Sequence, residues 1–197
     1  MDETMRGEFK KAVMAVQMGA PCNTCESREG CPKETRVLHL IKLLARAEEQ
    51  KSEYWVVLGS LSAAEACINI GYTELAVNIL TDLFNRYPEH PANILARNII
   101  SLRLTTAILI NYLSKGYFNI QSILDVYNIV NNATEMVYND KRIIIVIMWN
   151  REVVNIINLL SGYRSKVESA GVQEFIELFN EVTNYTGNYA SCEKLDN

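Results

Sequence analysis

The feature that most constrains the fold is a series of apolar stripes at helical spacing, several of them ended by glycine or proline. The cleanest stripe lies between Gly71 and Pro88 and consists of Ala76, Ile79, Leu80, Leu83, Phe84 and Tyr87. Residues three or four apart share one face of an α-helix, so this spacing predicts an amphipathic helix from Thr73 to Tyr87. Gly71 separates it from an equally apolar segment, and Pro88 stops it. The block therefore predicts a helical hairpin.

The same spacing recurs along the chain and predicts about eight helices. Their expected bounds are residues up to 18, then 34–49, 52–70, 73–87, 91–113, 121–137, 141–161 and 169–183. The run Ile143–Ile147 has strand propensity because β-branched side chains are stiff at χ1. A lone strand would have no pairing partner, so we expect this run to be helical and fully buried. The prediction is an all-α fold of antiparallel helices, arranged as a helical-hairpin solenoid or as a bundle.

Length and composition indicate one globular domain. The chain has 197 residues, 49% of them hydrophobic and 21% charged, which is close to the usual globular mixture. We expect a single domain over residues 1–186, with a cysteine-rich loop at 20–33. Residues 187–197 have no apolar period, and we expect a mobile C-terminal tail there.

Small residues mark the contact expected between the two helices of the hairpin. Ala64 lies seven residues before Gly71, and Ala76 and Leu80 follow early in the second helix. The block resembles a tetratricopeptide (TPR) repeat over residues 57–90, since that family has small residues at the positions of Ala64 and Ala76, a large apolar one at Leu80 and proline at Pro88. The resemblance ends there, because the next 34 residues do not repeat the signature.

The resemblance implies that the chain binds a protein or peptide in a concave groove, usually on the first helix of each pair. The exposed polar residues expected in such a groove are Ser60, Glu65 and Arg97. The sequence departs from the family at Ser60 and Cys67, where an aromatic residue is usual. A helical bundle with one matching hairpin is the alternative fold.

Three cysteines in the loop at 20–33 form a possible metal or redox site. Cys22, Cys25 and Cys31 fall within ten residues of one another, and thiolates so placed can hold zinc or an iron–sulfur cluster. The nearest candidate for a fourth ligand is His39, and the others are Cys67 and Cys192. A disulfide in the loop, or reduced cysteines without a ligand, are the alternatives.

No familiar catalytic motif is present in the sequence. There is no glycine-rich phosphate loop followed by Lys-Ser/Thr, no Gly-x-Ser-x-Gly and no His-Glu-x-x-His. Only His39 and His90 could serve as histidine bases, and neither has an evident catalytic partner. Trp55 and Trp149 adjoin apolar runs and are expected in the core. The sequence favours a protein that is not an enzyme.

Charge and hydropathy narrow the classes of partner. The net charge is −4, and no stripe of Lys and Arg is apparent, which disfavours nucleic acid. The longest apolar run, Ile143–Trp149, is far shorter than the roughly 20 residues of a membrane span. The first twenty residues contain charges where a signal peptide needs an apolar run, so we expect a cytoplasmic protein.

Three carboxylates, Glu174, Glu177 and Glu181, share one face of a predicted helix. This face could be a cation site or could dock a basic partner, or it could simply be solvated. Taken together, the sequence predicts a non-enzymatic α-helical interaction module, an adaptor or complex subunit that binds another protein or itself. The alternative is a metal- or iron–sulfur-dependent sensor or redox protein that uses the cysteine loop.

Overall fold

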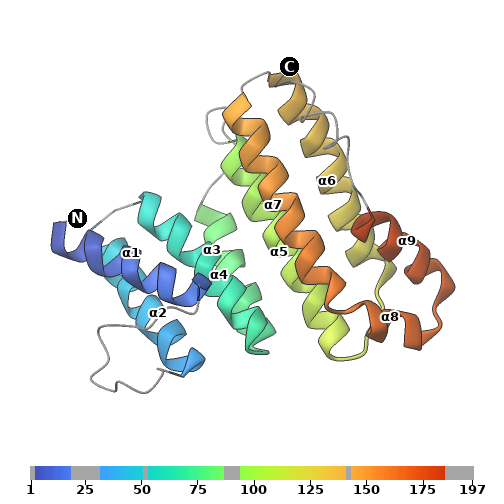
Figure 1. Cartoon of the computed structure of the whole chain (residues 1–197), viewed down its shortest axis with the longest axis horizontal. Coiled ribbons are helices and arrows are strands. Elements are labelled where there is room, and N and C mark those ends of the chain that lie inside the picture. The colour runs from blue at the N-terminus through green and yellow to red at the C-terminus, as the bar shows by residue number, and fades with distance from the viewer. Residues whose placement is uncertain (1–2, 19–31, 51–52, 87–93, 141–142, 185–197) are drawn as a thin grey trace. The chain divides into compact units, whose positions relative to one another are not determined.

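The computed structural model describes residues 3–18, 32–50, 53–86, 94–140 and 143–184. Within these ranges the chain is all-α, with nine helices and no strand (Figure 1). The helices are α1 (Glu3–Met18), α2 (Lys33–Glu49), α3 (Glu53–Asn69), α4 (Thr73–Arg86), α5 (Ile94–Ser114), α6 (Ile120–Asp140), α7 (Ile143–Ser161), α8 (Arg164–Ala170) and α9 (Gln173–Thr183). The predicted all-α fold is confirmed.

The contacts between helices divide the chain into two compact units, Met1–Arg86 and Tyr87–Asn197. The first unit contains α1 to α4, and the second contains α5 to α9. That residues 1–186 behave as one domain stays a prediction.

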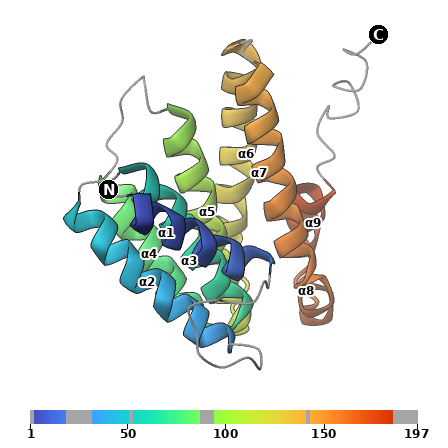
Figure 2. The same ribbon diagram turned by 60° about the vertical axis from the view of Figure 1, so that its left-hand side comes forward.

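Helix α3 is the centre of the first unit, because α1, α2 and α4 all pack against it (Figure 2). Its small residues make this possible, since small side chains let neighbouring helices approach closely on several sides. Those that are buried are Gly59, Ser60, Ser62, Ala63, Ala64 and Ala66. A Cβ atom on Gly59 would lie 2.4 Å from Cζ of Phe9 on α1 and 2.6 Å from Cδ2 of Leu44 on α2. Gly59 therefore makes room for both helices at once.

A tight turn at Gly71 joins α3 to α4. Gly71 has φ +89°, which favours glycine, and its N–H donates to the carbonyl of Ile68 at 3.1 Å. The N–H of Tyr72 donates to the carbonyl of Cys67 at 2.8 Å, which completes a Schellman cap. Ala64 and Ala76 are both buried, as the hairpin prediction required. The hairpin is confirmed, whereas membership of the tetratricopeptide family stays a prediction.

The second unit is built on three long helices. Helix α6 runs back along α5, and α7 runs back along α6, so α5 and α7 point in the same direction (Figure 1). Helix α9 packs against α6 and α7, and the short α8 leads into it. Trp149 on α7 is fully buried and its Nε1–H donates to Oγ1 of Thr134 on α6 at 2.9 Å. The predicted core position of Trp149 is thereby confirmed, while Trp55 in the first unit is half-buried.

The last predicted helix, 169–183, is wrong at its start. Two helices occupy this part of the chain, because α8 ends at Ala170 and α9 begins at Gln173. Between them Gly171 has φ +69°, and its N–H donates to the carbonyl of Glu168 at 3.3 Å. This left-handed cap ends α8, so the apolar pattern that begins near Ser169 does not form one continuous helix.

The apolar run Ile143–Ile147 is helical, as predicted, but it is not fully buried. Ile147 is 56% exposed and the next residue, Met148, is 48% exposed. Consecutive apolar residues point to every side of a helix, and the neighbouring helices do not cover every side of α7. No helix in the described ranges, α7 included, is long and apolar enough to cross a membrane.

Candidate functional site

The predicted metal site falls largely outside the described residues. The described residues do not include Cys22, Cys25 and Cys31. They also do not include Cys192 or His90. His39 lies on α2, and its Nε2 atom is buried with no hydrogen-bond partner in the described part of the chain. Among the described residues, no group of three or more His, Cys, Asp or Glu side chains is placed to hold a metal ion. His39 is thus the only one of the four proposed ligands with a described position, and its free ring nitrogen fits a ligand.

Cys67 on α3 is a poor candidate for the fourth ligand. The side chain is buried, and this burial raises the pKa of its thiol from 9.0 to about 11. At neutral pH the group is therefore a protonated thiol, whereas metal ligation and nucleophilic attack both need the thiolate. Cys67 acts as a small apolar residue of the core.

The structure describes each of the three polar residues proposed for a groove, and one of them is not where the prediction put it. Ser60 is only 6% exposed, so the expectation that it is exposed is wrong. The reason is the central place of α3, because α1, α2 and α4 all pack against it. Glu65 on α3 and Arg97 on α5 are half-buried, both take part in interactions, and they belong to different units.

The three carboxylates of α9 are exposed, as expected for a solvated or docking face. Glu174, Glu177 and Glu181 all face solvent, and Glu177 accepts a hydrogen bond from Nε2 of Gln173 at 2.8 Å. None of the three forms an ion pair with another residue that the structure describes. That they bind a partner stays a prediction.

The most distinctive surface of the described residues lies on α7. Three large apolar side chains are exposed there, Ile147 (56%), Met148 (48%) and Val154 (45%), together with Arg151. We call these four residues the α7 face. Arg151 is four residues after Ile147 and three after Met148, and Val154 is seven after Ile147. These spacings place the four residues on the same side of the helix. Solvent-facing helix positions are normally polar, so this surface is unusual.

Elsewhere in the described chain, large exposed apolar residues occur singly or, as for Tyr72 and Leu75, as a pair. On α2, for example, Leu38 is exposed, and its neighbours three and four positions away are the polar residues Glu34, Thr35 and Lys42 and the half-buried Ile41. Single apolar residues of this kind are normal on a protein surface. The α7 face was not predicted from the sequence, because the whole run Ile143–Ile147 was expected in the core. The length of the apolar run could have indicated this face. The seven consecutive apolar residues Ile143–Trp149 point to all sides of a helix, and one buried side needs fewer.

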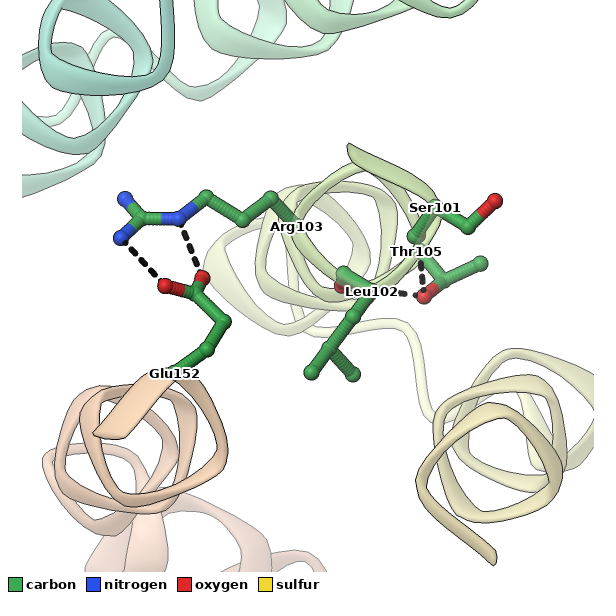
Figure 3. A network of polar contacts seen from close by, with 5 residues as sticks. All are labelled: Ser101, Leu102, Arg103, Thr105 and Glu152. Carbon is green, nitrogen blue, oxygen red and sulfur yellow. Dashed lines mark hydrogen bonds and ion pairs between the residues drawn. The ribbon is translucent and has the colours of Figure 1, made fainter. Parts of the chain in front are cut away.

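On another side of α7, a buried ion pair joins it to α5 (Figure 3). The guanidinium of Arg103 faces the carboxylate of Glu152, with Nη2 donating to Oε2 at 3.0 Å and Nε donating to Oε1. Glu152 is buried and Arg103 is nearly so. Such bidentate pairs have a fixed geometry, so this one sets the register of α7 along α5.

Next to this pair, the helix α5 is regular and internally bonded. The hydroxyl of Thr105 donates to the carbonyls of Ser101 at 3.0 Å and Leu102 at 3.1 Å (Figure 3). Neither side chain of the ion pair is open to a ligand, because each charge is directed at the other. The pair therefore serves as scaffold, and the α7 face is held on a helix whose register and inner side are fixed.

Comparisons with known proteins identify no relative of this chain. No family model matches the sequence, no curated protein matches it, and no solved structure matches the fold.

Proposed function

We propose that this chain is a non-enzymatic α-helical interaction module, and that it binds another protein through the α7 face. The observation that carries this proposal is the exposure of Ile147, Met148 and Val154 beside Arg151 on one side of one helix. Covering three large apolar side chains removes their surface from water, which is the main source of association free energy. Methionine and arginine are also enriched at protein interfaces, where lysine and glutamate are depleted.

The scaffold behind the face supports the same proposal. Trp149 is buried and bonded to Thr134, and Glu152 is paired with Arg103, so the inner side of α7 is held from two helices. A binding surface on a rigid helix needs little ordering when the partner arrives, which preserves affinity.

A site-specific crosslinker tests the proposal. A photoreactive residue replaces Ile147, and the full chain is irradiated in an extract of the cells that make it. The matched control carries the same residue in place of Leu38, which is exposed on α2 to a similar extent but has mostly polar neighbours. We expect a protein crosslinked at position 147 and not at 38, and the purified partner should lose binding to Ile147→Ser/Met148→Ser/Val154→Ser. Equal crosslinking at both positions, or none at either, would contradict the proposal.

The second candidate function is a metal- or iron–sulfur-dependent sensor, and one observation favours it. The Nε2 atom of His39 is buried without a hydrogen-bond partner among the described residues, and a buried nitrogen without a partner is costly unless something binds it. Zinc on three cysteines and one histidine is a common structural site. Cys22, Cys25 and Cys31 would supply the thiolates.

Metal analysis after anaerobic purification tests this candidate. We expect about one zinc ion or one iron–sulfur cluster per chain, lost in the triple variant Cys22→Ser/Cys25→Ser/Cys31→Ser and weakened in His39→Gln. The matched control is Cys67→Ala, which should keep the metal because Cys67 is buried as a thiol in the core. A metal-free wild-type protein, or full retention in the triple variant, would rule the site out.

A further inference from the structure

Arg151 stands in the middle of the α7 face. On a helix the nearest surface neighbours of a residue are three and four positions away, and for Arg151 these are Ile147, Met148, Val154 and Asn155. All four are exposed and none is charged. The guanidinium therefore has no carboxylate within reach on its own helix, and three of its four neighbours are apolar.

Arg151 also has no ion pair or hydrogen bond to any residue that the structure describes. Two other exposed arginines are paired, since Arg46 lies 3.2 Å from Glu8 and Arg86 lies 2.7 Å from Glu48. A cation placed among apolar side chains would lose hydration when a partner covers them. A partner that binds here must supply a compensating negative charge.

A second copy of this chain fits the face poorly. In a symmetric dimer the same surface meets itself, and Arg151 lies near the centre of the face. The two guanidinium groups would then lie close together, and α7 offers no exposed carboxylate to separate them, because Glu152 is buried against Arg103. Like charges placed opposite one another at an interface are strongly unfavourable. Charge complementarity thus favours a different partner.

From this geometry we infer that the α7 face binds an amphipathic helix of a protein partner that carries an aspartate or glutamate within its apolar stripe. Ile147 and Val154 are seven residues apart, or about 10 Å along the helix axis, which matches two turns of a packed helix. The partner's apolar residues cover Ile147, Met148 and Val154, and its carboxylate accepts hydrogen bonds from the guanidinium of Arg151. The inference rests on the proposed function and specifies the chemistry of the partner.

Three synthetic helical peptides test the inference on the full chain. All have 18 residues and the same leucine stripe, and they differ only in one central position of that stripe, which is Glu, Gln or Lys. Fluorescence anisotropy of the labelled peptides should give binding of the Glu peptide at least about tenfold tighter than that of the Lys peptide. Arg151→Glu should reverse this order. Arg6→Glu, a matched change at an exposed arginine of α1, should leave it unchanged.

Other results would overturn the inference, and each is distinct. Equal affinity for all three peptides, unaffected by Arg151→Glu, would show that no carboxylate is recognised. A concentration-dependent dimer in sedimentation, abolished by Ile147→Ser/Val154→Ser, would assign the face to a second copy. Binding to vesicles of phosphatidylserine and phosphatidylcholine, abolished by the same variant, would assign it to lipid.

The peptide and crosslinking results also separate this inference from the proposed function. A protein crosslinked at position 147, with no charge preference among the peptides, would leave the interaction module in place and remove only the acidic helix. A charge preference that Arg151→Glu reverses supports both. Circular dichroism of each variant confirms that a loss of binding does not come from unfolding.

Discussion

Helices α3 and α7 are both rich in apolar residues, yet one is enclosed and the other keeps an open side. Three helices pack against each of them. In α3 the residues at the contacts are small. At Gly59, for example, the side chains of Phe9 and Leu44 both approach the position that a Cβ atom would occupy. In α7 they are large, and Ile147 and Val154 remain exposed. The comparison teaches that residue size, and not apolar content alone, decides how completely neighbours close around a helix.

The largest expected effect concerns the inner side of α7. Replacing Arg103 by Ala should lower the free energy of unfolding of the second unit by about 3 to 5 kcal/mol, because the carboxylate of Glu152 stays buried without its cation. Urea denaturation in a Trp55→Phe background, followed by the fluorescence of Trp149, measures it.

Two controls make this result specific. The double variant Arg103→Met/Glu152→Leu should recover most of the loss, because no unpaired charge is then buried. Arg86→Ala should cost less than about 1 kcal/mol, since its pairs with Glu48 and Asp82 are exposed to water. A small effect of Arg103→Ala would mean that the pair does not hold α7 in register.

The enclosure of α3 predicts a pH dependence. The pKa of Cys67 is about 11 in the folded chain and 9.0 in the unfolded one, so folding favours the protonated thiol. Its contribution to stability is complete below pH 9 and is lost as the pH rises from 9 to 11. One pKa unit corresponds to about 1.4 kcal/mol, so the loss amounts to about 2 to 3 kcal/mol above pH 11.

A comparison with Cys67→Ala isolates this contribution from other groups that titrate at high pH. The difference in unfolding free energy between wild type and variant should be constant below pH 9. Above pH 9 the wild type should lose stability relative to the variant. Parallel curves for the two proteins up to pH 11 would show that water reaches the thiol and that α3 is less enclosed than described.

The close approach at Gly59 predicts a smaller loss. Gly59→Ala places a Cβ atom within 2.6 Å of both Phe9 and Leu44, so these packed side chains must shift, at about 1 to 3 kcal/mol. Gly7→Ala on α1 is the matched control, because nothing lies within 4 Å of its Cβ position. It should stabilise the chain by up to about 1 kcal/mol through higher helix propensity. Thermal unfolding by circular dichroism compares the two, and equal effects would contradict the close packing.

These contrasts show what the sequence could predict. Periodicity located the helices and Gly71 located the tight turn, because both signals are local. The partners of α7 are not local, since Arg103 and Glu152 are 49 residues apart, and no spacing rule pairs them. Ser60 was expected to be exposed because it is polar, but small polar residues also suit a close helix contact. The α7 face was missed because a run of consecutive apolar residues has no polar gap to mark its open side.

The smallest expected effect is the sharpest test of that open side. Val153 and Val154 are neighbours on α7, yet Val153 is 1% exposed and Val154 is 45% exposed. Val153→Ala should cost about 2 kcal/mol, from lost burial of two methyl groups and the cavity they leave. Val154→Ala should change stability by less than about 0.5 kcal/mol, as for most surface changes. Urea denaturation measures both, and a comparable loss at Val154 would mean that part of the chain already covers the α7 face. In that case the apolar residues would belong to the core and would not be available to a partner.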